Sequence, residues 1–111
     1  MRKFSKDMMG ASAIPIILAL LKNKETYGYE IKKDLEKLSS GKIIWKEGSL
    51  YPVLKKMETS NLIESVWNIE DHDRPRKYYK ILPKGKEELA LYLEDFKMIT
   101  DILNNLLKLK G

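Results

Sequence analysis

The sequence contains no cysteine and only one histidine, and both shortages restrict its possible chemistry. Without cysteine the chain cannot form disulfides, present a thiol nucleophile or give thiolate ligands to zinc. With one imidazole, that of His72, no set of side chains supplies a nucleophile together with its base and an orienting group. A chain of 111 residues has room for one core and little for a substrate cleft. We therefore expect a binding module rather than an enzyme, without a cofactor.

The question of a metal site centres on His72, which stands between Asp71 and Asp73. Metal-binding histidines are normally held by further hydrogen-bonding partners, and an exposed loop tip lacks them. We interpret these three side chains as solvated and expect no metal site.

Long hydrophobic runs are also missing. The main apolar stretch, GASAIPIILALL at residues 10–21, is far shorter than the ~20 apolar residues of a membrane span, and Pro15 interrupts it. The polar sequence KNKETY follows it, in place of the small residues of a signal-peptide cleavage site. We therefore expect a cytoplasmic protein with no membrane partner, in which this stretch forms a core helix.

Positive charge exceeds negative charge, and the excess lies in one part of the chain. The net charge is +5, with 18 Lys or Arg against 11 Asp or Glu in residues 1–86 and 3 against 5 in residues 87–111. Aromatic and turn residues lie between the cations of the first part. This combination favours duplex DNA as the partner over anionic lipid. A basic surface that serves only solubility is the alternative interpretation.

Two helices are expected in the first forty residues. The first helix begins after Ser12, with Pro15 in its first turn, or after Ser5, with a kink at Pro15; we favour the longer, kinked helix. The second is predicted over residues 27–41, where Ser39, Ser40 and Gly41 end it. Its apolar side consists of Tyr27, Ile31, Leu35 and Leu38.

A short strand is expected at the β-prone run KIIW, residues 42–45, and a third helix and a hairpin follow it. The helix opens at Glu47 and Gly48, and its apolar side consists of Leu50, Val53, Leu54 and Met57. The segments LIESVWNI at 62–69 and KYYKIL at 77–82 each alternate between two faces, which predicts two paired strands. The tip of this hairpin is EDHDRPR, residues 70–76.

The last element, from Lys84 to about Lys108, is a long helix. Its apolar residues step by three and four without a break, which is typical of a helix that packs against another helix. They are Leu89, Tyr92, Phe96, Ile99, Leu103 and Leu106. Because a three-helix body this small cannot cover the whole seam, we interpret it as a subunit interface and expect a homodimer.

This order of elements is that of a winged helix. The expected fold class is mainly α with a small β-hairpin: a winged helix-turn-helix at residues 1–83 and a dimerisation helix at 84–111, in one structural unit. In such a domain the third helix enters the major groove, and the hairpin tip reaches a phosphate backbone or the minor groove. The expected DNA-contacting residues are Tyr27, Lys32, Ser49, Tyr51, Lys55, Arg74, Arg76 and Lys77.

Several stretches resemble the PadR family of bacterial transcriptional regulators. They are TYGYEI at 26–31, EGSLYPVLKKMETSNLIE at 47–64, and Trp67 followed by RPRKYYKIL at 74–82. The single C-terminal helix is similar to the compact branch of that family. The resemblance implies a homodimer, commonly a repressor, and some members of that branch bind planar drugs or other aromatic molecules between their subunits.

Two positions depart from the family pattern. Family members usually have Thr where Leu82 stands, and it caps the last helix; here Pro83 must open the helix without a side-chain cap, so its start is expected to be shifted or frayed. Drug-binding members of the compact branch have Trp where Phe96 stands. Phenylalanine keeps an aromatic wall but has less area and lacks the indole N–H.

The resemblance implies an effector slot at the dimer seam, next to Phe96. The kinked first helix is expected to bring small or apolar side chains over it, namely Met8, Ala11 and Ser12. The alternative is that two Phe96 side chains close on each other as ordinary core packing.

The sequence therefore predicts a sequence-specific transcriptional regulator, a homodimeric repressor that leaves its double-stranded operator when an aromatic or apolar effector binds. The competing hypothesis is a winged helix that binds only another protein, with its basic wing serving solubility.

Overall fold

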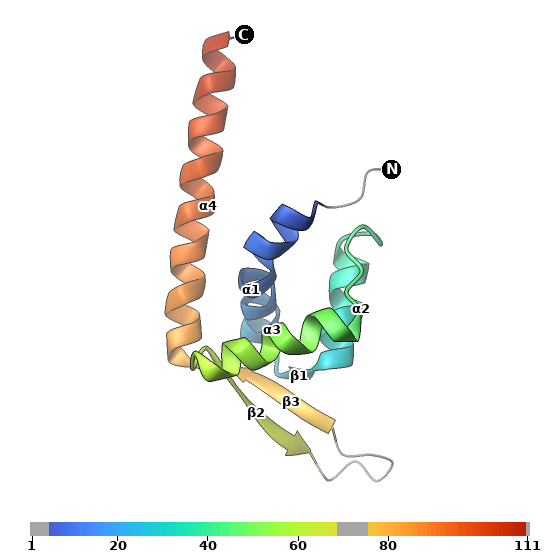
Figure 1. The fold of residues 1–111 in the computed structure, drawn as a ribbon. Coiled ribbons are helices and arrows are strands. Elements are labelled where there is room, and N and C mark those ends of the chain that lie inside the picture. Colours follow the sequence, from blue (N-terminus) through green and yellow to red (C-terminus); the bar gives the residue numbers. More distant parts are fainter. Residues whose placement is uncertain (1–4, 69–75, 111) are drawn as a thin grey trace.

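The computed structural model describes residues 5–68 and 76–110. Within these residues, four helices and three strands follow one another as a winged helix with a long last helix (Figure 1). They are α1 (Lys6–Asn23), β1 (Thr26–Tyr27), α2 (Gly28–Leu38), α3 (Glu47–Thr59), β2 (Ile63–Asn68), β3 (Arg76–Ile81) and α4 (Pro83–Lys110). The predicted fold class is confirmed. His72, the predicted contact Arg74 and most of the hairpin tip lie outside the described residues.

Helix α1 has the longer of the two predicted forms. The Ser5 hydroxyl oxygen caps it by accepting a hydrogen bond from the Met8 N–H at 3.1 Å. Pro15 lies inside the helix and cannot donate to the carbonyl four residues earlier, and the Ser12 hydroxyl donates to the Met8 carbonyl instead of standing in solvent. Both features bend helices, and Figure 1 shows α1 changing direction along its length.

The core lies where α1, α2 and α3 meet one face of the sheet. Its most buried side chains come from every one of these elements: Ile17, Leu18, Ile31, Leu50, Leu54, Met57 and Ile63. The predicted apolar sides of the second and third helices are confirmed except at Tyr27, which lies in β1 before α2 begins, and at Leu38, the last residue of α2, which is 72% exposed. Gly41 follows with a φ of 80°, and its N–H donates to the Glu36 carbonyl at 2.8 Å, which ends the helix as predicted.

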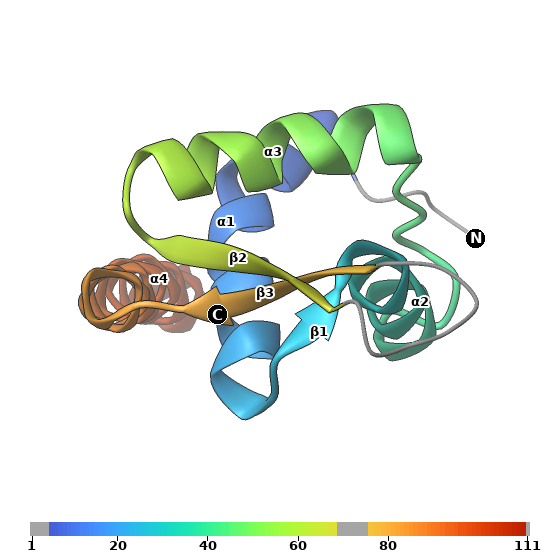
Figure 2. The same ribbon diagram turned by 90° about the horizontal axis from the view of Figure 1, so that it is seen from below.

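The sheet has the antiparallel order β1-β3-β2 (Figure 2). The predicted hairpin is confirmed, with Ile63 opposite Ile81 and Trp67 opposite Lys77. The strand expected at KIIW is wrong: Ile43 and Trp45 are buried, but this segment joins no strand. The third strand is instead β1, which pairs with β3 just before α2 begins.

Helix α4 begins at Pro83, so the proline does open the helix, one residue before the predicted start. The chain enters it beside the end of α3, because the Leu82 N–H donates to the Leu62 carbonyl at 3.0 Å. A side chain at Gly85 would overlap that same Leu62 carbonyl oxygen, so glycine lets α4 approach the body closely.

The 28 residues of α4 extend over about 42 Å at ~1.5 Å per residue, and the far half stands clear of the body in Figure 1. Leu89 is 5% exposed and belongs to the core of its own chain. Further along the same seam Ile99 is 54% and Leu103 53% exposed. No helix in the described part of the chain combines the length and apolar composition that a membrane crossing requires.

Candidate nucleic-acid interface

One side of helix α3 packs in the core, and the opposite side is exposed. Leu50 and Leu54 are buried in the core, which determines how the helix is rotated about its axis. Ser49 and Lys55 are exposed on the opposite side. A helix that is anchored in this way presents a fixed row of polar side chains to a macromolecular partner.

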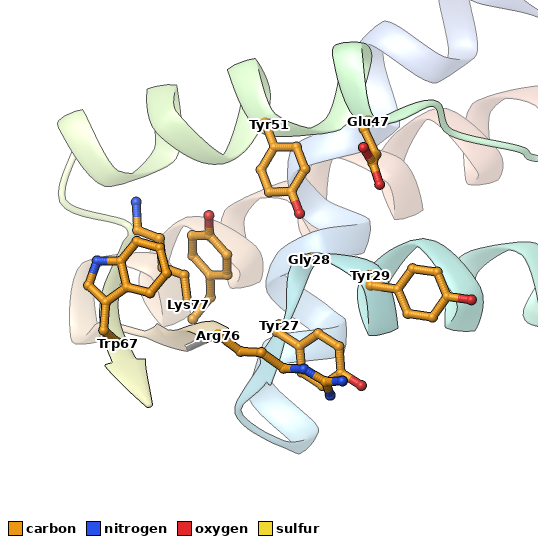
Figure 3. A pocket seen from close by; sticks show the side chains of 9 residues that line it. Tyr27, Gly28, Tyr29, Glu47, Tyr51, Trp67, Arg76 and Lys77 are labelled. Carbon is orange, nitrogen blue, oxygen red and sulfur yellow. The ribbon is translucent and has the colours of Figure 1, made fainter. Parts of the chain in front are cut away.

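A cleft of about 540 Å³ opens beside the start of α3 (Figure 3). It lies between the first turns of α2 and α3 and the wing strands β2 and β3. Its lining combines aromatic rings with two cations: Tyr27, Gly28, Tyr29, Glu47, Tyr51, Trp67, Arg76, Lys77 and Tyr79. Aromatic faces next to Arg and Lys form a surface suited to the sugars and phosphates of a nucleic-acid backbone.

Tyr51 enters this cleft from α3 and packs against the backbone of α2. A Cβ atom at Gly28 would lie 2.8 Å from the Tyr51 hydroxyl oxygen, so the ring occupies the space that any other residue at position 28 would need. Figure 3 shows Tyr51 pointing from α3 toward Gly28. The glycine therefore fixes the distance between the start of α2 and the exposed side of α3.

Lys77 joins the wing to the end of α3. Its Nζ lies 3.3 Å from Glu58 Oε1 and 5.7 Å from the centroid of the Tyr79 ring. The Glu58 oxygen is buried, and it lies within ion-pair distance of Lys77 without an aligned hydrogen bond from any described residue. Because the buried oxygen of this carboxylate needs a compensating charge, the ion pair holds the Lys77 ammonium against the end of α3, beside the cleft.

Tyr79 is 3% exposed beneath this ion pair. Burial, followed by the negative charge of Glu58 and the neighbouring Tyr51, raises the pKa of Tyr79 from its usual 10.0 to about 12. The phenol therefore remains neutral at physiological pH.

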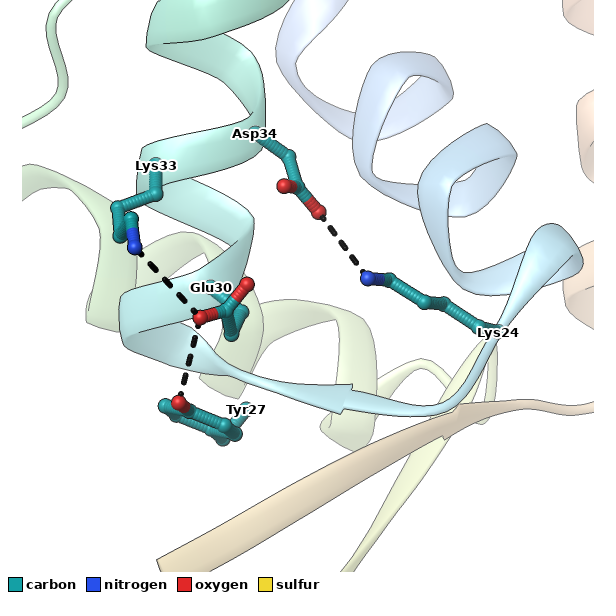
Figure 4. Close-up of polar contacts among 5 residues, drawn as sticks. All are labelled: Lys24, Tyr27, Glu30, Lys33 and Asp34. Carbon is teal, nitrogen blue, oxygen red and sulfur yellow. Dashed lines mark hydrogen bonds and ion pairs between the residues drawn. The ribbon is translucent and has the colours of Figure 1, made fainter.

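Arg76 and Tyr27 meet at the other side of the cleft. The guanidinium carbon of Arg76 lies 4.5 Å from the centroid of the Tyr27 ring. That ring is 5.3 Å from the ring of Tyr78, tilted by 59°. The Tyr27 hydroxyl donates to Glu30 Oε1 at 3.3 Å (Figure 4).

The structure brings four of the predicted DNA-contacting residues into this one cleft: Tyr27, Tyr51, Arg76 and Lys77. Ser49 and Lys55 lie on the exposed side of α3. Lys32 is half-buried on α2 and does not line the cleft.

Sequence reasoning missed three side chains of this region. Trp67 lies on the same alternating face of β2 as the buried Ile63, yet its indole is 61% exposed and lines the cleft. Tyr29 lines the cleft, although only the stripe containing Tyr27 was considered. Glu58 gave no signal, because an acidic residue near a helix end is normally solvated.

The predicted effector residues lie on α1 and α4, which pack side by side (Figure 1). Phe96 is half-buried, Met8 and Ala11 are exposed, and Ser12 is buried with its hydroxyl donated to a carbonyl of α1. Among the described residues no group of His, Asp and Glu side chains has the arrangement of a metal site.

The chain is similar to known regulators over most of its length. The model of the PadR-like family of transcriptional regulators matches residues 17–91. A PadR-like transcriptional regulator from Bacillus cereus is 33% identical, with a TM-score of 0.79 over 92% of this chain and 97% of that one. A transcriptional regulator from Clostridium thermocellum is 28% identical, with a TM-score of 0.82 over 90% and 97%.

A protein of Lysinibacillus sphaericus without an assigned function is 30% identical over 98 residues, which is 88% of this chain and 90% of that protein. The family match covers α2, α3 and the wing, the elements that build the cleft. The chain therefore belongs to the PadR-like family of transcriptional regulators.

Proposed function

We propose that the protein binds duplex DNA sequence-specifically, with α3 in the major groove and the wing at the backbone. The observation that carries this proposal is the rotation of α3, whose core anchors leave Ser49 and Lys55 facing outward beside the basic, aromatic cleft. Ser and Lys can hydrogen-bond to base edges, whereas Arg76 at the tip end of β3 is suited to a phosphate.

We further propose a homodimer formed through α4. The seam beyond Tyr92 includes Ile99, Leu103 and Leu106, each about half exposed in one chain, and apolar side chains at this spacing pack well against another helix. Residues 1–83 would then be the DNA-binding part and 84–111 the dimerisation helix of one structural unit. Two copies of α3 in a dimer read half-sites about one helical turn apart, ~34 Å, or a multiple of this.

The regulatory part of the proposal is repression that an aromatic or apolar effector relieves. The half-buried Phe96 and the exposed Met8 and Ala11 support an apolar slot near the dimer seam, and Ser12 contributes a wall because its hydroxyl is already donated within α1. A flat apolar molecule in such a slot gains affinity mainly from buried area, at roughly 25 cal/mol per Å².

Fluorescence anisotropy with candidate promoter duplexes across a salt series tests DNA binding. Log affinity should fall with log salt by about 0.9 for each phosphate neutralised. Arg76→Ala should weaken binding to every duplex and reduce the slope by about 1, whereas Ser49→Ala and Lys55→Ala should change which base is preferred. Lys97→Ala is the matched control, because Lys97 is exposed on α4 and pairs with Asp101 away from the cleft.

Absence of salt-dependent binding to any promoter or random duplex would favour the alternative in which the winged helix binds only protein. The effector arm is tested separately with a panel of planar dyes, followed by Trp45 and Trp67 fluorescence. Saturable binding of one dye per dimer that Phe96→Ala weakens supports the slot, and dye binding indifferent to this change contradicts it.

A further inference from the structure

The ring of Tyr27 is held in place by three separate contacts. Its backbone pairs with Tyr78 in the sheet, and the two rings are in contact at 5.3 Å. Its hydroxyl donates to Glu30, whose carboxylate oxygen is also 4.0 Å from the ammonium of Lys33 (Figure 4). Strand pairing, ring contact and hydrogen bond together leave the ring little freedom to turn.

Arg76 lies over this fixed ring. Its guanidinium carbon is 4.5 Å from the ring centroid, and Figure 3 shows the side chain extending across Tyr27 at the edge of the cleft. The face of an aromatic ring attracts a guanidinium through its quadrupole. Because the ring carries no net charge, this contact fixes the group without cancelling its positive charge.

A guanidinium whose position is already restricted binds an anion more tightly than a mobile one. An arginine side chain loses considerable rotamer entropy when it is placed on a partner, and a contact that already restricts it lowers this loss at the moment of binding. Arg76 is also the first residue of β3, where the described part of the wing begins again, so its placement sets the position of positive charge at the tip end of this strand.

We infer that Tyr27 is a positioning residue for Arg76, and that its main role is to hold the guanidinium where a DNA backbone phosphate can meet it. This inference rests on the proposed DNA binding and refines it, because Tyr27 was first expected to act as a direct DNA contact. The recognised anion is a backbone phosphate, so the effect should be the same for every duplex sequence.

Tyr29 provides a matched control within the same cleft. It lies two residues further along the chain, is exposed, and also has a cation over its ring, but that cation is Lys33 at 5.7 Å. A loss of DNA affinity caused only by removing an aromatic ring from the cleft should therefore be shared by Tyr29→Leu. A loss that depends on Arg76 should not be.

The experiment is a double-mutant cycle on DNA affinity, measured at one salt concentration with full-length protein. Tyr27→Leu should weaken binding about two- to fivefold, the size expected for one cation–π contact, and Tyr27→Phe, which keeps the ring, should stay near wild type. In an Arg76→Ala background the Tyr27→Leu change should have almost no further effect. Tyr29→Leu should have the same effect with and without Arg76.

A second measurement reports the contact without DNA. The side-chain protons of Arg76 should show an upfield ring-current shift in NMR spectra of the wild type and of Tyr27→Phe, and this shift should be lost in Tyr27→Leu. Thermal unfolding of each variant identifies any general loss of folding.

The outcomes separate the two levels of the proposal. Wild-type protein that binds no duplex overturns the proposed function and this inference together. Wild-type binding with losses that multiply independently, or a Tyr27→Phe variant as weak as Tyr27→Leu, overturns the positioning role alone. Coupled losses with rescue by phenylalanine support it.

Discussion

The raised pKa of Tyr79 gives a quantitative test of the packing beneath the cleft. The phenol is buried under the Lys77–Glu58 ion pair, and its pKa is about 12 in the folded chain against 10.0 ordinarily. The perturbation is alkaline pH, which ionises Tyr79 in the unfolded chain before it does so in the folded one. Tyr79→Phe removes the titrating group while keeping the ring that fills the core.

The sign and size of the effect follow from the two pKa values. Because the folded pKa is the higher one, the contribution of Tyr79 to stability is fully present below pH 10 and is lost as the pH rises toward 12. At pH 11 the unfolded phenol is about ten parts ionised to one neutral and the folded phenol the reverse, which lowers the unfolding free energy by about 1 kcal/mol. The limit well above pH 12 is about 3 kcal/mol.

Urea unfolding of wild type and Tyr79→Phe at matched protein concentration, between pH 8 and pH 11, measures this difference. All other ionisable groups are common to both proteins, so their contributions cancel in the comparison. The gap between the two unfolding free energies should be constant up to about pH 9 and then shift by about 1 kcal/mol against the wild type by pH 11. Parallel curves over the whole range would show that Tyr79 ionises as freely in the folded chain as in the unfolded one, which would refute the packing argument.

Three further substitutions test the cleft, the α4 contact and the seam. Gly28→Ala should push the Tyr51 ring away and weaken DNA binding, while the unfolding free energy changes by less than about 1 kcal/mol, because the obstructing atoms are the end of a side chain. Gly85→Ala should lower the unfolding free energy by about 1 to 3 kcal/mol in chemical denaturation, since a backbone carbonyl cannot move aside; Gly10→Ala, with open space around it, should not. Leu103→Asp should give monomers in sedimentation, because an unpaired carboxylate in a desolvated interface costs several kcal/mol, and an unchanged dimer would contradict the proposed seam.

The helices and the hairpin could be predicted because apolar periodicity reports burial directly. Leu50 and Leu54 recur at helical spacing, and they are buried on one side of α3. Ile63 and Ile81 occupy the inward positions of alternating strands and lie opposite each other. In each case the residues that form the periodic pattern are the residues that pack in the core.

The strand prediction at KIIW was wrong because β-propensity and burial do not supply a hydrogen-bonding partner. Ile43 and Trp45 are buried, as their apolar side chains suggest. They lie, however, in the connection between α2 and α3 and not in a strand. The second partner of β3, besides β2, is the two-residue strand Thr26–Tyr27, which is too short to have a period. Its pairing depends on where α1 and α2 place the chain, so a tertiary arrangement decided it.

Individual members of the cleft could be predicted, but their mutual contacts could not. Aromatic and basic residues near the predicted reading helix and wing pointed to Tyr51 and Arg76. The stacking of Arg76 on Tyr27 joins residues far apart in sequence and requires β1 to lie next to β3. Glu58 has a role only because β3 brings Lys77 against the end of α3.

The seam of α4 illustrates a limit of heptad patterns in general. Leu89 and Ile99 belong to one uninterrupted series of apolar residues, yet Leu89 is covered by its own chain and Ile99 is more than half exposed. A pattern of this kind predicts that a helix is packed along its whole length. It does not reveal that one part packs against its own chain and another part against a different partner. Gly85 brings the first turns against the body, and about 42 Å of straight helix then carries the same stripe beyond it. The first part of the series therefore stabilises the winged-helix body, and the second part is available for the proposed dimer, so substitutions in the two parts should separate folding from assembly.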